Sequence, residues 1–287
     1  MTGDERRLFN KFFAALITVI LITSCTSVSR STVPDESGQP LQINMPDDVK
    51  EIKPLEEKPV ETEPEKAPEP DAALNEEKKP VERKPMVALT FDDGPFDFTD
   101  IILDILERHG VHATFFLVGK EIEGREDSVI RMARNGNEIA GHSWAHNRLT
   151  ELSNLEIKET IESTSALIEK VTGIPSPSFI RPTYGLVNKR VANVCAELGY
   201  ALINWTVDPQ DWMLLNADKV YDSVMKSVKE NSIILLHEIF ESTAAATERI
   251  VPALIEKGYE LVTLSVLIYH LYGELKPGNV YGSPPVR

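Results

Sequence analysis

The sequence is poor in cysteine: its 287 residues include only Cys25 and Cys195. Two cysteines can form at most one bridge, so no disulfide framework can hold a folded domain together. Cys195 falls on the apolar face of a helical pattern over residues 191–198, where we expect a small buried residue rather than a nucleophile. Stability must therefore come from the burial of apolar side chains.

Aromatic residues are absent from residues 31–85, a segment that holds ten of the 19 prolines and many Glu and Lys residues. Such a composition cannot bury enough apolar surface to offset the entropy lost on ordering. We therefore predict an extended, acidic, disordered linker over residues 25–85. About 200 residues remain, which is the size of one α/β domain.

The N-terminal apolar stretch Phe12–Ile22 is shorter than the roughly 20 residues that a membrane-spanning helix needs. It follows the basic residues Arg6, Arg7 and Lys11, as in a secretory signal. It ends in Ile22-Thr23-Ser24-Cys25, which resembles the bacterial lipobox, where the cysteine is diacylated after cleavage. This resemblance implies a signal peptide over residues 1–24 and an extracytoplasmic protein anchored to a bacterial membrane by a lipid on Cys25. An ordinary signal peptide or a short anchor, with an incidental cysteine, is the alternative.

Basic charge is also scarce, with 30 Lys and Arg residues against 45 Asp and Glu residues and a formal net charge of −15. A chain of this charge repels the phosphate backbone, so we do not expect nucleic acid as a partner. A neutral sugar polymer is indifferent to the same charge. We expect the protein to be a monomer.

From Met86 onward, short apolar runs alternate with longer stretches of helical period. This alternation is typical of a parallel sheet covered by helices. Strands are predicted at residues 86–91, 113–118, 138–141, 178–181, 201–206, 232–236 and 260–264. Helices are predicted at residues 98–109, 121–135, 154–172, 188–199, 217–229 and 243–258, with a glycine at or just after the end of most of them.

These elements predict a single distorted (β/α) barrel with about seven parallel strands over residues 86–272. A doubly wound open sheet is the alternative, because periodicity does not distinguish a closed sheet from an open one. Residues 273–287 are polar and rich in Pro and Gly, so we expect a tail that follows the surface or is loose.

Polar residues cluster after the carboxyl ends of the predicted strands, where barrel enzymes place their sites. Asp92 and Asp93 leave the first strand, and adjacent carboxylates on a strand point to opposite sides, which suits one to a metal and the other to a proton. His142 and His146 follow the third strand, and a helical turn would point both imidazoles the same way. With one carboxylate they supply three ligands and leave positions open, as in a catalytic zinc site.

Three further clusters follow later strands. Arg181 could orient a carboxylate through a bidentate pair, and an Asp-Trp step could form the wall of a pocket. Each cluster also has a plain structural interpretation, such as a surface ion pair, a capping aspartate or a hydrogen-bonded rim histidine. The residues concerned are Arg181 and Tyr184 after the fourth strand, Asp211 and Trp212 after the fifth, and Leu235 and His237 at the end of the sixth. His109, His112 and His270 belong to no cluster.

The five clusters, in this order, resemble the motifs of the polysaccharide deacetylases of carbohydrate esterase family four, the NodB-homology domain. The resemblance covers about residues 86–270. It implies that Asp92 is the catalytic base and that Asp93, His142 and His146 bind a divalent metal. Zinc is the expected ion, with Co²⁺, Ni²⁺ or Mn²⁺ as alternatives.

The same resemblance implies roles for the other clusters. Arg181 would orient the base, the backbone N–H of Tyr184 would bind the oxyanion, and His237 would be the general acid. Asp211 would support either His237 or Arg181, and both alternatives stay open. Trp212 and Leu235 would line the site.

Two positions depart from the family pattern. Thr183 stands where the family often has a proline, which could loosen the loop that carries Tyr184. Asn147 stands where a proline often follows the second metal histidine. Neither change removes a ligand or a proton carrier.

The expected function is metal-dependent removal of N-acetyl groups from a cell-surface polysaccharide, with N-acetylglucosamine residues of peptidoglycan or a related glycan as the preferred substrate. An O-acetyl esterase acting on xylan is an alternative within the family. A non-catalytic wall-binding lipoprotein is an alternative of another class. Two histidines and a carboxylate also serve non-haem iron oxygenases, although the neighbouring Asp92 and His237 favour proton transfer.

Overall fold

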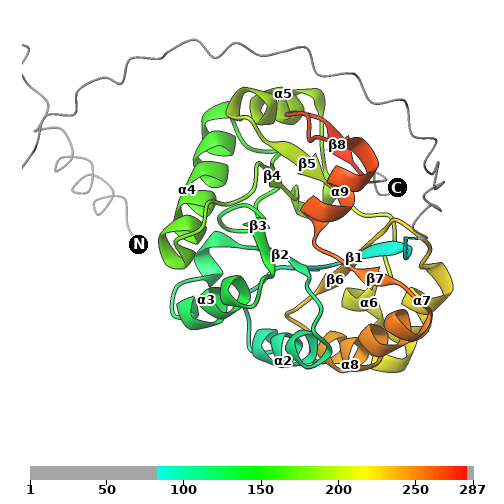
Figure 1. Ribbon diagram of the computed structural model, residues 1–287. Helices are drawn as coiled ribbons and strands as arrows, with labels where there is room; N and C mark the ends of the chain where they lie inside the picture. The colour runs from blue at the N-terminus through cyan, green and yellow to red at the C-terminus, as the bar shows by residue number, and fades with distance from the viewer. Residues whose placement is uncertain (1–82, 283–287) are drawn as a thin grey trace, which may run out of the picture. The chain divides into compact units, whose positions relative to one another are not determined.

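Parallel strands form the centre of the structure, a computed structural model in which residues 83–282 are described (Figure 1). The strands are β1 Met86–Asp92, β2 Thr114–Leu117, β3 Glu138–Gly141, β4 Phe179–Ile180, β5 Ala201–Ile203, β6 Ser232–His237, β7 Glu260–Leu261 and β8 Val280–Tyr281. All of their pairings are parallel, as the alternation of strands and helices predicts.

Helices surround the strands in Figure 1. They are α2 Thr99–His109, α3 Glu126–Arg134, α4 Asn154–Thr172, α5 Lys189–Leu198, α6 Asp211–Leu214, α7 Ala217–Ser227, α8 Glu241–Glu256 and α9 Leu264–Tyr272, with short 3₁₀ turns η1 Gly119–Glu121 and η2 Thr183–Gly185. Helix α4 shows why the sequence signals work: Ser153 and Glu156 form a reciprocal capping box at its start, and Gly173 ends it in the left-handed conformation.

The sheet curls into a distorted barrel. Its strand order is β6-β1-β2-β3-β4-β5-β8, and β7 pairs with the start of β1. After β5 the chain returns to β6 through a bridge between Val207 and Ile234, supported by a hydrogen bond of 2.9 Å from Leu235 N–H to the Val207 carbonyl. The predicted (β/α) barrel is thus confirmed, and a single bridge rather than a continuous strand closes it.

Several boundaries differ from the predictions. The strand expected over 201–206 is continuous only to Ile203, and residues 204–207 then make isolated backbone contacts, including the bridge between Val207 and Ile234. The strand expected over 260–264 stops at Leu261, because Leu264 begins α9. Strand β8 lies inside the predicted tail and pairs with β5. Helices α6 and α9 were not predicted, since α6 has only four residues and α9 is apolar on most sides.

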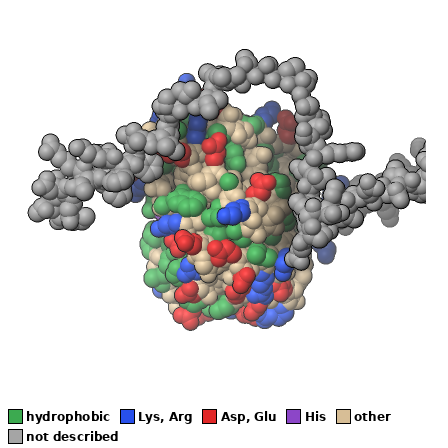
Figure 2. All heavy atoms as spheres, turned by 90° about the vertical axis from the view of Figure 1, so that its left-hand side faces the viewer, with side chains coloured by type: hydrophobic (Ala, Val, Ile, Leu, Met, Phe, Trp, Pro, Cys, Tyr) green, Lys and Arg blue, Asp and Glu red, His purple; other side chains and the backbone are tan. Residues whose placement is uncertain are grey.

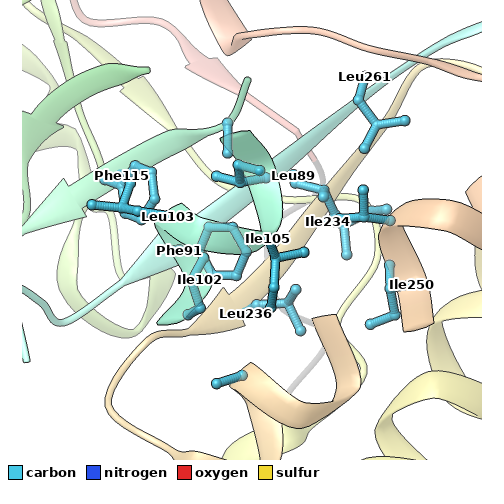
Figure 3. Close-up of a cluster of buried hydrophobic side chains, with 14 of the residues drawn as sticks. Leu89, Phe91, Ile102, Leu103, Ile105, Phe115, Ile234, Leu236, Ile250 and Leu261 are labelled. Atoms are coloured by element: carbon cyan, nitrogen blue, oxygen red, sulfur yellow. The ribbon is translucent and has the colours of Figure 1, made fainter. Parts of the chain in front are cut away.

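The main hydrophobic core lies between the outer face of the sheet and the helices. Alternate residues of a strand point to opposite faces, so Val87, Leu89 and Phe91 of β1 pack outward against α2 and α8. Figure 3 shows Leu89 and Phe91 of β1, Ile234 and Leu236 of β6, and Ile102 and Ile105 of α2 gathered in this layer. The remaining β1 residues, Met86, Ala88, Thr90 and Asp92, are left to face the barrel interior.

A second cluster fills the barrel interior. It combines small and aromatic residues of the strands, such as Ala88, Phe116 and Phe179, with Leu264 and Leu267 of α9. The backbone N–H of Leu264 donates to Thr114 Oγ1 at the start of β2, at 2.9 Å. Helix α9 therefore plugs the amino-terminal end of the barrel, while the opposite end stays open for polar residues.

Charges on the surface are mixed in sign. On the face that is turned to the left in Figure 1, where α3 and α4 lie, Figure 2 shows acidic and basic side chains interspersed. Arg131 of α3, for example, contacts Asp100 at 3.1 Å and Glu107 at 2.7 Å on α2. Such exposed pairs contribute little to stability. Within residues 83–282, no helix has the length and apolar character to cross a bilayer.

Replacing Phe115 with alanine is expected to lower the free energy of unfolding by about 3–5 kcal/mol, because the ring is buried and the change leaves a cavity. Phe115 is fully buried on β2 and stacks on Phe91 with ring centroids 5.3 Å apart. Urea unfolding of the full chain would measure the change. Ile101→Ala is the control, since Ile101 is exposed on α2; an equal loss in both variants would contradict the core assignment.

Candidate active site

The polar clusters meet at the carboxyl ends of the strands, around a cavity of about 350 Å³. Asp92 ends β1, His142 follows β3, Arg181 follows β4, and His237 ends β6. Because the strands are parallel, these ends share one edge of the barrel. The cavity is lined by Asp92, Asp93, His142, His146, Tyr184, Trp205, Asp208, Trp212, Leu235, His237 and Phe240.

Asp93, His142 and His146 converge on one point. Asp93 Oδ1 lies 3.4 Å from His142 Nε2 and 3.2 Å from His146 Nε2, and one ligand atom from each residue lies within 4.8 Å of the others. The expected helical turn is wrong: residues 142–147 form a loop in which Ser143 and His146 adopt positive φ angles of 63° and 55°. The loop, not helical spacing, brings the imidazoles together.

This donor set fits a divalent cation. Asp93 Oδ1 is buried and has no hydrogen-bond partner among the described residues. His142 Nδ1 lies 2.8 Å from the Arg181 carbonyl, so a proton on Nδ1 leaves the Nε2 lone pair for a metal. Burial raises the pKa of Asp93, but the close contact with His146 and the charges of His142 and His237 lower it to about 2. Burial lowers the pKa of His142, which favours the neutral ring that binds metals.

Asp92 has a different partner. Its Oδ1 accepts a hydrogen bond of 2.6 Å from Arg181 Nη1, and the same nitrogen donates to Thr90 Oγ1 at 2.7 Å. The predicted bidentate pair is therefore wrong, because the other guanidinium nitrogens donate to the carbonyls of Ile203 and Asn204. Asp92 Oδ2 lies 3.8 Å from His142 Nε2.

Both adjacent carboxylates face the cavity, which contradicts the expectation that they point to opposite sides. Asp92 is the last residue of β1 and faces inward by strand alternation. Asp93 has left the strand and has a φ of 74°, a left-handed conformation that turns its side chain back toward the histidines. Two neighbouring carboxylates can thus serve one cavity with different partners.

His237 and Asp211 form a second pair. Asp211 Oδ1 lies 2.7 Å from His237 Nδ1, and Asp211 Oδ2 accepts hydrogen bonds from His237 N–H and Thr243 Oγ1, both at 2.7 Å. Of the two alternatives for Asp211, the structure shows contact with His237. Burial lowers the pKa of His237, but the hydrogen bond and charge of Asp211, with Asp92 and Asp93, raise it to about 9. The imidazole is therefore protonated at neutral pH.

The remaining predicted residues, Tyr184, Trp212 and Leu235, also line the cavity. Tyr184 and Trp212 are half-exposed, whereas Leu235 is buried at the cavity floor. Tyr184 has a φ of 59° within the η2 turn and packs edge-on against His146, with centroids 4.9 Å apart. Its ring therefore lies beside His146, one of the three converging residues.

The two departures from the family pattern meet at Ser143. The backbone N–H of Asn147 donates to Ser143 Oγ at 3.0 Å, and Thr183 Oγ1 lies 3.5 Å from the same oxygen. A proline at position 147 could not make the first bond, because proline has no N–H. The loosening that we expected from Thr183 is thus opposed by a contact between the histidine loop and the η2 turn.

Sequence reasoning missed several residues of the cavity and its support. Trp205, Asp208 and Phe240 line the cavity, and Glu238 is buried directly behind it. Glu238 directly follows His237 at the end of the largely apolar strand β6, and that position was the one available signal. Cys195 is buried, and burial raises the pKa of its thiol to about 12, so it is not a nucleophile. Cys25 lies outside the described residues.

A sequence model of the family described as polysaccharide deacetylase matches residues 79–203. Chitooligosaccharide deacetylase of Sinorhizobium fredii is 34% identical over 194 residues, which cover 63% of this chain and 90% of that protein. The chain belongs to the polysaccharide deacetylase family. The resemblance drawn from the sequence motifs is thereby confirmed.

Other relatives of this family member include two peptidoglycan deacetylases. Peptidoglycan-N-acetylmuramic acid deacetylase of Bacillus subtilis is 39% identical over 183 residues, covering 63% of this chain and 38% of that protein. Peptidoglycan-N-acetylglucosamine deacetylase of Listeria monocytogenes is 39% identical over 197 residues, covering 68% and 41%. The matched part of this polysaccharide deacetylase family member thus spans less than half of either relative.

A solved structure agrees with the fold of this deacetylase family member. The family 4 acetyl xylan esterase from Clostridium thermocellum, in complex with a cobalt ion, has 32% sequence identity and a TM-score of 0.63. The match covers 70% of this chain and 100% of that one. That structure of the same fold therefore holds a cobalt ion.

Replacing His142 with alanine is expected to weaken Zn²⁺ affinity about a hundredfold or more, because one of three converging donors is lost. Competition with a chelating dye would measure the affinity. His270→Ala is the control, since His270 is exposed on α9 and belongs to no cluster. Unchanged Zn²⁺ affinity in the His142 variant would show that the metal does not bind in this cavity.

Proposed function

We propose that this protein hydrolyses N-acetyl groups of a cell-surface polysaccharide with the help of a divalent metal. The observation that carries the proposal is the grouping of Asp93, His142 and His146 within 4.8 Å next to two proton carriers in one cavity. Family membership supports the same reaction class. Water and the N-acetyl amide would give acetate and the free sugar amine.

A divalent cation held by Asp93, His142 and His146 would supply Lewis acidity toward the acetyl carbonyl and lower the pKa of water. Asp92 acts as the base that accepts the proton of the attacking water. Arg181 occupies Asp92 Oδ1 and leaves Oδ2 toward the cavity. The fixed guanidinium thus sets which carboxylate oxygen receives the proton, and this positioning lowers the barrier because no reorientation is needed.

The negative charge that develops on the carbonyl oxygen must be stabilised by a hydrogen-bond donor. The backbone N–H of Tyr184 is the candidate, because η2 places Tyr184 against His146. Backbone donors of this kind act through their fixed direction and contribute most where charge appears only in the transition state.

His237 donates the proton that the departing amine nitrogen requires. Asp211 binds Nδ1 of the ring, so Nε2 is the nitrogen available to the cavity. Because Asp211 raises the pKa of His237 to about 9, the acid is charged before the reaction begins. The proposed base and acid are thus separate residues: Asp92 is held by Arg181, and His237 is held by Asp211.

The preferred substrate is N-acetylglucosamine in peptidoglycan or a related glycan. Relatives that bear peptidoglycan and chitooligosaccharide names support this preference. A lipid on Cys25, a tether through the acidic linker and a Zn²⁺ ion complete the proposal. An anchored enzyme outside the cytoplasmic membrane meets cell-wall glycan before any other polymer.

Acetyl esters are the second candidate, favoured by the structural similarity to an acetyl xylan esterase. The same residues can direct water onto an acetyl ester, whose alkoxide leaving group needs less protonation than an amine. Acetate release from acetylated peptidoglycan, chitin oligomers and acetylxylan, compared at equal metal loading, would rank the three. Binding to insoluble glycan without acetate release from any of them would favour a non-catalytic role.

Replacing Asp92 with asparagine is expected to lower kcat by a factor of about a hundred to ten thousand, as loss of a general base does. Zn²⁺ affinity should change little, since Asp92 is bound to Arg181 rather than grouped with the metal donors. Acetate release from a chitin oligomer, with metal content measured on the same sample, separates the two effects. Full activity in this variant would exclude Asp92 as the base.

Replacing Asp211 with asparagine is expected to move the alkaline limb of the kcat profile to lower pH. His237 must be protonated to act, so activity is present below its pKa and is lost as pH rises through it. Asp211 raises that pKa to about 9, and an amide has no charge with which to do so. The kcat profile from pH 6 to pH 10 would show the shift; an alkaline limb at the wild-type position would exclude His237 as the acid.

A further inference from the structure

Glu238 is a fully buried carboxyl group next to the cavity that the mechanism above does not use. It follows His237 at the end of β6, and its backbone N–H donates to the Asp92 carbonyl at 3.2 Å. Its side chain lies beneath the turn that leaves β1. One carboxylate oxygen, Oε1, has no hydrogen-bond partner among the described residues.

Gly94, in that turn, has no room for a side chain. A β-carbon built on Gly94 would overlap the Glu238 carboxyl, and its three nearest atoms are all atoms of Glu238. The φ angle of Gly94 is not in the left-handed range that favours glycine. The contact with Glu238, rather than backbone conformation, therefore requires glycine at this position.

The turn is held from both sides. On one side, Asp93 N–H donates to the Phe116 carbonyl at 3.2 Å, and the Gly94 carbonyl accepts from Val118 N–H at 2.9 Å. On the other side lies the Glu238 carboxyl, whose Oε2 accepts a hydrogen bond from Thr99 Oγ1. Asp93 therefore sits in a turn clamped between the end of β2 and the end of β6.

The Glu238 carboxyl acts in this place as a neutral group. Burial, together with the nearby charges of Asp92, Asp93 and Asp100, raises its pKa to about 8 against the opposing effect of the hydrogen bond from Thr99. A neutral acid can fill this space without adding a third negative charge beside Asp92 and Asp93.

We propose that Glu238 is a positioning residue whose buried carboxyl supports the Asp93–Gly94 turn and sets the place of Asp93 relative to His142 and His146. The inference rests on the proposed function, because it takes Asp93 as a metal ligand. It couples the strand that carries His237 to the turn that carries Asp93. It also makes Gly94 and Glu238 a matched pair, in which one residue must be small because the other is present.

Zn²⁺ affinity of the full chain, measured by competition with a chelating dye, tests the support. Glu238→Ala is expected to weaken the affinity about tenfold to a hundredfold, as loss of a ligand's outer support does. Glu238→Gln keeps the shape and neutrality of the side chain, so its affinity should stay within about threefold of wild type. Glu241→Ala, an exposed glutamate at the start of α8, is the control for loss of a carboxylate.

A double-mutant cycle tests the pair. Gly94→Ala alone should weaken Zn²⁺ binding, because its methyl group meets the Glu238 carboxyl. In the double variant with Glu238→Ala the methyl enters the vacated space, so affinity should recover about fivefold or more relative to Gly94→Ala, a coupling expected only of residues in contact. If Gly94→Ala alone does not fold, recovery of folded protein in the double variant is the equivalent supporting result.

Three outcomes would overturn the proposal. A folded Glu238→Ala protein with wild-type Zn²⁺ affinity would show that the carboxyl supports nothing. A Glu238→Gln protein as weak as the alanine variant would show that charge, not shape, acts. A double variant whose Zn²⁺ affinity is no higher than that of Gly94→Ala would show that the two residues do not interact.

The same measurements separate this inference from the proposed function. Loss of Zn²⁺ affinity in His142→Ala, together with wild-type affinity in Glu238→Ala, would overturn only the role of Glu238. Unchanged affinity in His142→Ala would instead remove the metal site on which the proposed function depends.

Discussion

The buried guanidinium of Arg181 joins the strands that build the candidate site. It has no solvent exposure, and it donates to Thr90 and Asp92 of β1 and to the carbonyls of Ile203 and Asn204 at the end of β5. Its own carbonyl faces Nδ1 of His142. A buried charge is tolerated only when such partners replace water. Asp92, His142 and the barrel wall are therefore positioned by a single residue.

Four acids lie around the cavity: Asp92, Asp211 and Glu238 are buried, Asp93 is partly exposed, and each has different neighbours. Asp92 is paired with Arg181, Asp93 with the two histidines, and Asp211 with His237. Glu238 lacks a cation, and burial keeps it neutral at neutral pH. Acid–base chemistry at neutral pH needs groups whose environments differ in this way. The site achieves the difference by giving each carboxyl group a distinct neighbour rather than by spacing the groups far apart.

Much of the fold could be predicted because its signals are local. The apolar runs of β1 and β6, the Ser153–Glu156 capping box and the glycine after α4 depend on residues close in the sequence. The site residues could be predicted because they follow strand ends, and parallel strands bring those ends to one edge. The motif resemblance then added the expected roles, which spacing alone does not supply.

The failures have a common cause, which is that the deciding contact lies far away in the sequence. Strand β8 exists because Val280 and Tyr281 pair with Leu202 and Ile203, and nothing in its two residues announces a strand. Asp93 and His146 were placed correctly for the wrong reason. Strand alternation and helical spacing do not describe residues in the left-handed conformation, and only the folded turns show where those side chains point.

Gly94 shows most clearly what local sequence patterns cannot predict. In the sequence, Gly94-Pro95 suggests a turn, and the usual explanation of a turn glycine is its conformational freedom. In the structure its φ angle lies outside the left-handed range, and the space of its side chain belongs to Glu238, 144 residues later in the chain. A local pattern therefore identified the residue correctly, but the physical reason for it is tertiary. The turn that carries Asp93 is thus in contact with a residue that follows β6, far away in the sequence.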